Sequence, residues 1–283
     1  MPLSVLFIFL ACLNDCSFLC DRNTAVRLFD IRTGRAIGNG YSHGSEISQI
    51  YLSQSGNSLP ERLLAIVDTN DDLYVTKVVK PEAFKFGSMV DSIAWCQKAD
   101  ILTALMDGQT VCWYYPQAAF VDSDLLEPMK VSAPSPEFGK RPRIHEFQSS
   151  HLVVRRADGA LIHSLVSTGP LLLHKYVSSG KWEGAVRLCR FLKQDPLWAS
   201  LAAMALNSKQ LATAELSLSS LREVAKAQYI SKIKKIPSSE GRLAELSVLR
   251  GEVEEAEKIL LQAQPPLVYR AIKLNIKLFR WER

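Results

Sequence analysis

Six cysteines are the residues of this sequence whose thiolates could bind a metal ion, and three of them lie close together near the start of the chain. They are Cys12, Cys16, Cys20, Cys96, Cys112 and Cys189. The first three are four residues apart and form no CxxC pair, whereas structural zinc sites and iron–sulfur clusters usually contain such pairs. We therefore expect no bound metal, and we interpret the cysteines as reduced, buried thiols in a reducing compartment.

The segment DTNDD could also bind a cation, because its side-chain oxygens recur at every second position. Asp68, Asn70 and Asp72 match the first three ligand positions of an EF-hand loop. However, Leu73 stands where that loop has glycine, and Val79 stands where it has the terminal glutamate. We therefore predict a hairpin turn here and no calcium site.

Catalytic and phosphate-binding motifs are missing from the sequence. It contains no GxxxxGK[ST], GxGxxG, GxSxG or HExxH pattern. The histidines are scattered, and none pairs with a cysteine at the spacing of metal ligands: they are His43, His145, His151, His163 and His174. The sequence therefore favours a protein that is not an enzyme and that binds no cofactor.

Charge is distributed unevenly along the chain. Residues 1–167 carry 15 Lys and Arg and 18 Asp and Glu, a net charge of −3, whereas residues 168–283 carry 19 and 11, a net charge of +8. A basic half can meet an acidic partner, but the mixed signs in this half are also typical of a solvated helix surface. Lys and Arg do not run together with interleaved aromatic residues, so we expect no nucleic-acid binding.

The apolar opening MPLSVLFIFLACL has some features of a signal peptide. It lacks a positively charged first region and a small-residue cleavage site, and it is too short to span a bilayer. We interpret it as a buried strand or as the start of a truncated gene model, and we expect no direct insertion into a membrane.

Alternating apolar and polar residues predict β-strands over the first part of the chain. The string VRLFDI is typical of the third strand of a WD-type blade, and similar cycles of about 40 residues follow it. Residues 122–142 are rich in Pro and charge and predict a long loop. Because a closed ring of such blades needs a longer chain, we expect residues 1–169 to form a partial WD40-type β-propeller of three to four blades, its C-terminal part.

From residue 170 onward the apolar period changes from 2 to 3.6, which predicts helices. We expect them near 171–178, 181–193, 196–207, 209–220, 222–234, 239–249, 252–263 and 267–279. Alanines recur at similar places in successive units, at Ala185, Ala214 and Ala256. Small residues let paired helices approach closely, so residues 170–283 are predicted to form a TPR-like α-solenoid.

Two short amphipathic helices within residues 176–206 are predicted to join the sheets to the solenoid. Their apolar stripes include Trp182, Ala185, Cys189, Trp198 and Leu201. Asp195 can cap the second helix and Pro196 can occupy its first turn. Because so short a pair cannot bury its apolar face alone, we predict that it is a structural joint and a possible interface. The two tryptophans can be core residues or anchors for a partner.

Several strings of the sequence resemble one family throughout most of the chain. They are VDTNDDLYVT, VCWYYPQAAFVDSDLL, VVRRADGALIH, KYVSSGKWEGAVRLCRFLKQDPLWASLAAMAL, AQYISKIKKIPSSEGRLAE and VYRAIKLNIKLFRWER. These strings resemble the intraflagellar transport protein 80 family, whose members are WD-repeat subunits of the ciliary transport complex B. The resemblance runs from about residue 27 to residue 283 and places this chain in the later part of the second propeller and the start of the helical tail.

The resemblance implies a non-catalytic scaffold of the intraflagellar transport complex B that supports assembly of the cilium or flagellum. Its expected partners are other complex-B subunits, with self-association as an open alternative, at the cilium, flagellum and basal body on the cytoplasmic side. Three features depart from the family. Residues 1–20 do not match it, Gln264-Pro265-Pro266 lengthens a turn, and Trp281-Glu282-Arg283 ends the chain inside a helix that the family continues.

Two other classes of protein remain as alternatives. Vesicle-coat and nuclear-pore subunits also combine a propeller with a solenoid, and fold alone does not choose among them. An enzyme with a site on a propeller face would require titratable side chains that converge in space.

Overall fold

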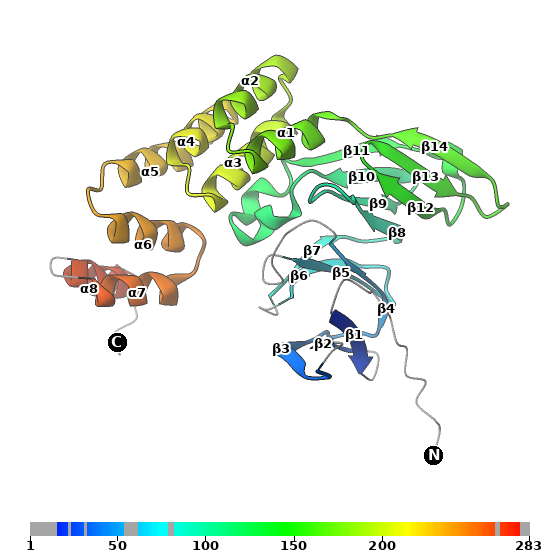
Figure 1. The fold of residues 1–283 in the computed structure, drawn as a ribbon, viewed down its shortest axis with the longest axis horizontal. Helices are drawn as coiled ribbons and strands as arrows, with labels where there is room; N and C mark the ends of the chain where they lie inside the picture. The colour runs from blue at the N-terminus through cyan, green and yellow to red at the C-terminus, as the bar shows by residue number, and fades with distance from the viewer. Residues whose placement is uncertain are drawn as a thin grey trace. The chain divides into compact units, whose positions relative to one another are not determined.

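The computed structural model describes residues 16–21, 24–30, 33–53, 62–78, 82–263 and 267–277. These residues form fourteen strands followed by eight α-helices (Figure 1), which confirms the predicted order of a sheet half and a helical half. The expectations for the first fifteen residues, for the Gln264-Pro265-Pro266 turn and for the last three residues lie outside the described parts of the chain.

The strands form four antiparallel sheets in which neighbours along the chain are neighbours in space. Sheet A contains β1 (Cys16–Asp21), β2 (Ala25–Asp30) and β3 (Ala36–Ser42), and sheet B contains β4 (Ile47–Leu52), β5 (Leu63–Asp68), β6 (Leu73–Lys77) and β7 (Ala83–Gly87). Sheet C contains β8 (Val90–Trp95), β9 (Leu102–Met106), β10 (Gln109–Trp113) and β11 (Lys130–Pro134), and sheet D contains β12 (Arg143–Gln148), β13 (His151–Arg155) and β14 (Leu161–Leu165). Sheets B and C are four-stranded meanders like the blades of a propeller, and sheets A and D have three strands each.

The predicted loop over residues 122–142 is wrong in part, because β11 lies within it. This strand completes sheet C by pairing with β10, from Gln109 opposite Pro134 to Trp113 opposite Lys130. It is an edge strand and its last three residues are exposed. Edge strands tolerate proline and lack the alternation of a half-buried strand, which explains why the sequence pattern did not reveal it.

The inner strands of sheets B and C are largely buried on both faces. Every residue of β5 is buried, and Trp113 at the end of β10 is fully enclosed. The indole Nε1 of Trp95 donates to the carbonyl of Tyr51 at 3.1 Å, which ties sheet C to sheet B. The near-continuous apolar strands of these two sheets therefore form the core of the sheet half.

Sheet D differs because one of its faces is exposed. Leu152 and Val154 of β13 are fully buried, and Phe147 of β12 is only 3% exposed. The alternate residues of β13 and β14 are exposed or half-buried. The two faces of this sheet thus differ in the way expected for an antiparallel sheet with one solvated side.

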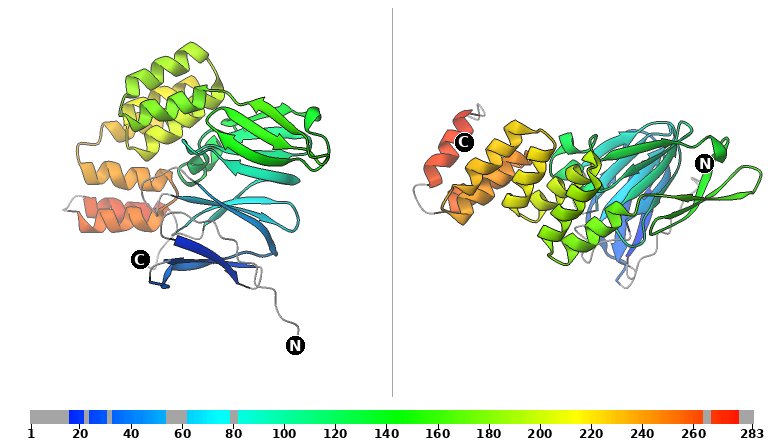
Figure 2. Two further views of the ribbon diagram at one scale, coloured as in Figure 1. Left: turned by 45° about the vertical axis from the view of Figure 1, so that its right-hand side comes forward. Right: turned by 90° about the horizontal axis from the view of Figure 1, so that it is seen from above.

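The helices agree with all eight predicted segments. They are α1 (Gly169–Ser178), α2 (Trp182–Leu192), α3 (Asp195–Asn207), α4 (Leu211–Ser220), α5 (Val224–Lys234), α6 (Ser239–Leu249), α7 (Val253–Gln262) and α8 (Leu267–Lys277). Lys193, Lys209 and Arg222 follow α2, α3 and α4 with φ values of 52°, 58° and 65°. A left-handed residue after a helix is the usual way to reverse the chain, and successive helices from α2 to α8 pack side by side (Figure 2).

The chain divides into two compact units. The first comprises residues 1–116 and 130–179, and the second comprises residues 117–129 and 180–283. The first unit therefore contains the sheets and α1, whereas α2 to α8 belong to the second. The domain boundary at residues 169 and 170 stays a prediction from the sequence. No described helix has the length and apolar content needed to span a bilayer.

His174 fixes α1 within the first unit. Its Nε2 lies 2.8 Å from the carbonyl oxygen of Tyr114, and its ring lies against Tyr115 with a centroid distance of 5.8 Å. Burial lowers the pKa of His174 to about 4, although the hydrogen bond to the Tyr114 carbonyl opposes this change. The neutral ring donates this hydrogen bond, so His174 is neutral in the folded chain at pH 7.

We expect acid to destabilise the chain through His174. The unfolded chain binds a proton below about pH 6.5, whereas the folded chain keeps the ring neutral down to about pH 4. Stability is therefore lost as the pH falls through this window, and between pH 7 and pH 4.5 the free energy of unfolding should drop by about 2–3 kcal/mol more in the wild type than in His174→Gln. Urea denaturation followed by circular dichroism measures this difference. The exposed His163→Gln should retain the wild-type slope, and equal slopes for wild type and His174→Gln would contradict the assignment.

Candidate functional site

The predicted joint consists of α2 and α3, and the sequence explains most of its local geometry. Pro196 lies in the first turn of α3, where the missing N–H costs no hydrogen bond. The expected cap by Asp195 is wrong, because Gln194 is the N-cap residue and makes no side-chain cap bond. Asp195 instead lies in the first turn, where its charge still interacts favourably with the helix dipole.

The five predicted joint residues are placed differently. Ala185, Cys189 and Leu201 are fully buried, Trp198 is 7% exposed and Trp182 is half-buried. Cys189 Sγ lies 3.7 Å from the carbonyl oxygen of Leu197 and so connects α2 to α3. Among the described residues, Trp182 and Trp198 make no ring contact with each other. The contact between Cys189 and the Leu197 carbonyl thus links the two helices, and the role of the five residues as a joint stays a prediction.

Helix α3 is the centre of the helical unit. All of its side chains from Leu197 to Leu206 are buried, and four alanines in this stretch let neighbouring helices approach closely. Ser200 Oγ donates to the carbonyl of Pro196 at 2.7 Å. Arg250 Nη2 donates to the carbonyl of Leu206 at 3.1 Å, which satisfies the end of α3 from a helix 44 residues away. The role of this region as an interface stays a prediction.

Lys226 adds a contact that the sequence pattern did not suggest. Its Nζ lies 2.6 Å from Asp122 Oδ2 and 2.9 Å from Asp124 Oδ2. Burial alone would lower the pKa of Lys226, but hydrogen bonds with both carboxylates raise it above its usual value. The lysine therefore stays charged and holds residues 117–129 against α5 within the second unit. No short motif signals this pairing, since the partners are about 100 residues apart.

The described cysteines are not poised for thiolate chemistry. Cys96, Cys112 and Cys189 are all buried and free. Burial raises the pKa of Cys112 and of Cys189 to about 12, although for Cys112 a hydrogen bond from Thr103 opposes this. At neutral pH Cys112 and Cys189 are therefore thiols, which are poor nucleophiles and poor metal ligands.

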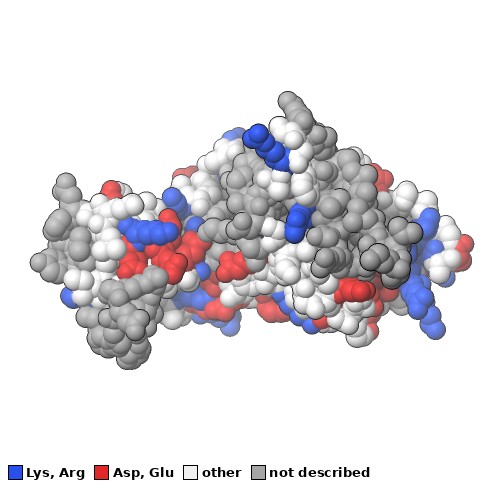
Figure 3. Space-filling view, turned by 90° about the horizontal axis from the view of Figure 1, so that it is seen from below, with Lys and Arg blue, Asp and Glu red and all other residues white. Residues whose placement is uncertain are grey.

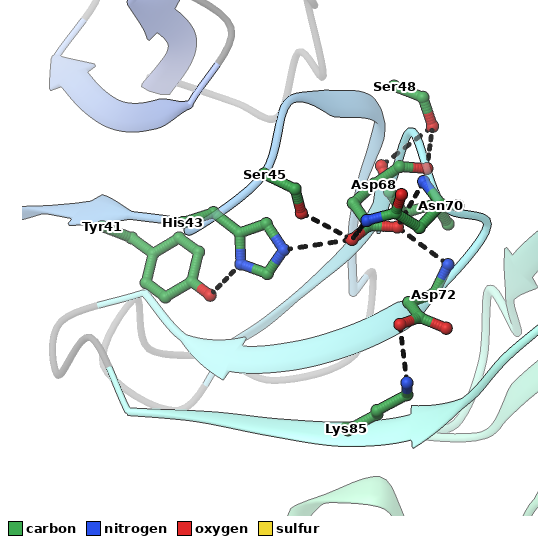
Figure 4. A network of polar contacts seen from close by, with 9 residues as sticks. Tyr41, His43, Ser45, Ser48, Asp68, Asn70, Asp72 and Lys85 are labelled. Carbon is green, nitrogen blue, oxygen red and sulfur yellow. Dashed lines mark hydrogen bonds and ion pairs between the residues drawn. The ribbon is translucent and has the colours of Figure 1, made fainter.

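Asp68 is the centre of a buried polar network at the turn between β5 and β6 (Figure 4). Its Oδ1 accepts the backbone N–H groups of Asn70 and Asp72, each at 2.9 Å, and its Oδ2 accepts the hydroxyl of Ser45 at 2.6 Å. Burial raises the pKa of Asp68, but these hydrogen bonds more than compensate and hold it below the usual value. The predicted hairpin turn is therefore confirmed, and the carboxylate stabilises it.

The same network extends to a histidine and a tyrosine. His43 Nε2 lies 3.5 Å from Asp68 Oδ2, and Tyr41 Oη lies 2.8 Å from His43 Nδ1. This order differs from a Ser–His–Asp triad, in which the serine hydroxyl bonds to the imidazole; here Ser45 donates to Asp68 directly. Among the described residues, no group of three His, Cys, Asp or Glu side chains could hold a metal ion. The geometry is that of a structural network that joins the strand before β4 to the β5–β6 turn.

Four arginines that sequence reasoning did not single out line a surface pocket on sheet D. Arg141, Arg143, Arg155 and Arg156 surround a volume of about 300 Å³ together with Ala157 and Gly159. The strings RPR and RRADG carry these residues. They reach one pocket because β12 and β13 are adjacent and antiparallel, which the sequence alone does not establish.

Comparison with family models decides the relationships of this chain. Residues 9–169 match the model described as the IFT80 second beta-propeller, and residues 197–283 match the IFT80/172/WDR35/WDR19 TPR domain. The chain belongs to the IFT80 family. The predicted fold class, a partial propeller followed by a TPR-like solenoid, and the predicted family resemblance are both confirmed.

Individual relatives agree with this membership in the IFT80 family. The intraflagellar transport protein 80 homologues of Rattus norvegicus and Mus musculus are 44% and 43% identical to the chain, over 90% of the chain and 33% of their own length. The intraflagellar transport protein 172 homolog of Mus musculus is 22% identical over 94% of the chain and 15% of its length. The chain thus spans about one third of the length of the IFT80 relatives.

We expect Asp68 to stabilise sheet B measurably. Asp68→Asn replaces an oxygen that accepts hydrogen bonds by a donor, so buried N–H and O–H groups lose their partner and the free energy of unfolding should fall by about 2–3 kcal/mol. Asp71→Asn is the matched control, because Asp71 is exposed in the same turn with a φ of 59° that asparagine tolerates. It should change stability by less than about 0.5 kcal/mol. If urea denaturation showed equal losses of stability for Asp68→Asn and Asp71→Asn, the loss of negative charge, and not the hydrogen-bond network, would be the cause.

We also expect Trp198 to contribute more to stability than the exposed aromatic residue nearby. Trp198→Ala should lower the free energy of unfolding by about 3–5 kcal/mol, because it leaves a cavity in the core. Trp182→Ala should cost less, since this side chain is half-buried. Phe191→Ala is the control: Phe191 is 82% exposed on α2, and its loss should cost under about 0.5 kcal/mol. Calorimetry of the three variants checks this order, and an equal effect of Phe191→Ala would refute it.

Proposed function

We propose that this chain acts as a non-catalytic scaffold subunit of the intraflagellar transport complex B and supports assembly of the cilium or flagellum. The observation that carries the proposal is the match of both halves to models of one family, together with 43–44% identity to two mammalian IFT80 homologues. Its partners would be other complex-B subunits, with self-association as a further contact. The site of action would be the cilium, flagellum and basal body on the cytoplasmic side.

The physical properties of the chain support a binding role more than a catalytic one. Stacked helix pairs bury a continuous core and present an extended outer surface, and α3 is enclosed by neighbours on all sides. The carboxylate of Asp68 closes a turn through hydrogen bonds with the backbone, and burial raises the pKa of Cys112 and of Cys189 to about 12, so these two thiols are protonated at neutral pH. The described residues therefore favour binding to other molecules through the exposed surface over chemistry at a reactive centre.

The proposal predicts that complex-B subunits co-purify with the chain. The affinity-tagged chain would be expressed in ciliated cells and recovered under mild salt, and its partners would be identified by mass spectrometry. We expect complex-B subunits to be enriched at least about tenfold over a tagged propeller protein of unrelated function, because specific interfaces survive dilution and washing. Fluorescence of the tagged chain should also mark cilia and their basal bodies.

A structural variant and a surface variant make this experiment specific. Trp198→Ala should lower recovery by destabilising the helical unit, whereas Phe191→Ala should retain it if α2 is not the interface. Recovery that stays at the level of the unrelated propeller for the wild-type chain would refute membership of the transport complex. Recovery of coat or nuclear-pore subunits instead would support those alternatives.

A further inference from the structure

The arginine pocket of sheet D lies where β12 begins and β13 ends. Arg141 and Arg143 approach it from the start of β12, and Arg155 and Arg156 from the end of β13. All four side chains are exposed, and Lys and Arg side chains gather at the right-hand end of the molecule as seen from below (Figure 3). The first 167 residues carry a net charge of −3, so this basic group is a local feature of an acidic half.

Two of these arginines face each other directly across the strands. Arg143 pairs with Arg155 in the β12–β13 ladder, and residues opposite each other in such a ladder lie on the same face. Like charges at this spacing destabilise a sheet. A bound oxyanion would remove that cost, since guanidinium groups bind carboxylate or phosphate through paired hydrogen bonds.

The carboxylates near the pocket do not neutralise the charges of Arg143 and Arg155. Arg156 Nη2 lies 3.4 Å from Asp158 Oδ2, and Arg141 interacts electrostatically with Asp91. Arg143 and Arg155 have no carboxylate of a described residue within ion-pair distance. Glu146, opposite Val153 in the same ladder, is the nearest acidic residue along β12. Arg143 and Arg155 therefore carry positive charges without an ion-pair partner among the described residues.

One apolar side chain, Leu161, lies next to the arginine pair on the same face, and a second, Leu165, lies four residues further along β14. Arg155 pairs with Leu161 of β14, and His151 pairs with Leu165. Leu161 is 52% exposed and Leu165 is 73% exposed. Exposed leucines beside a charged pocket are typical of surfaces that bind another protein. The six residues that line the pocket include no aromatic ring on which a nucleic-acid base could stack.

We propose that Arg143 and Arg155 bind an acidic segment of a partner protein. Its oxyanions would bridge the two guanidinium groups in the pocket, and neighbouring apolar side chains of the segment would cover Leu161. A volume of about 300 Å³ admits one or two acidic side chains, and both a carboxylate and a phosphorylated serine have the required chemistry. The site adds a surface of the sheet half to the contacts of the solenoid.

Peptide binding tests the site on the full chain. The probes are fluorescein-labelled hexaglutamate, hexaglutamine, and a glycine-rich hexapeptide with two phosphoserines, followed by fluorescence anisotropy. We expect hexaglutamate or the phosphopeptide to bind, hexaglutamine to bind at least about tenfold more weakly, and affinity to fall with added salt. Whichever of the two acidic peptides binds more tightly identifies the oxyanion.

The variant Arg143→Gln/Arg155→Gln should weaken binding of that peptide at least about tenfold, since both hydrogen-bonding forks are removed. The control Arg35→Gln/Lys98→Gln removes two exposed positive charges elsewhere in the sheet half and should change affinity less than about twofold. Circular dichroism should show that both variants are folded. Failure of both acidic peptides to bind, equal weakening by the two double variants, or tighter binding of labelled hexauridine than of either peptide would overturn the proposal.

Discussion

Residues 117–129 leave sheet C and join the helical unit, and the rest of the structure depends on this excursion. Both of its ends are fixed, because β10 and β11 are hydrogen-bonded neighbours with Trp113 opposite Lys130. Its middle is held by Lys226, which binds Asp122 and Asp124. Together with the link after residue 179, the chain passes between the two units three times. The two units are therefore connected by the chain at three points.

Within each unit, stability comes from different features. The sheets rely on apolar strands buried on both faces, and Asp68 then supplies the polar contacts that fix one turn between strands. The helices rely on close approach, which α3 permits through its alanines and through Arg250 at its C-terminal end. Such densely packed units are suited to hold surfaces in place.

Some polar groups of this chain stabilise the fold through hydrogen bonds, whereas others are exposed and can bind another molecule. His43 and Asp68 meet in a network that resembles a catalytic group only in composition, because its hydrogen bonds end on the backbone of a turn. Arg143 and Arg155 differ, since they oppose each other on an exposed face and have no carboxylate partner among the residues that the structure describes. Charged residues that repel each other in the folded state are better candidates for binding a ligand than polar residues whose hydrogen bonds are all made within the fold.

The sequence by itself determined the order of elements and the family. Periods of 2 and 3.6 depend only on which face of a strand or helix is apolar, so all eight helices and several blade strands could be predicted, as could the turn at Asp68 from its Asn/Asp content. Contacts between residues far apart in the sequence could not be predicted, because no local sequence pattern depends on them. The β11 strand, the binding of Lys226 to Asp122, and the meeting of Arg143 with Arg155 each depend on segments brought together by pairing and packing. Only the tertiary structure decided these, since register and helix packing are fixed by the whole core and not by neighbouring residues.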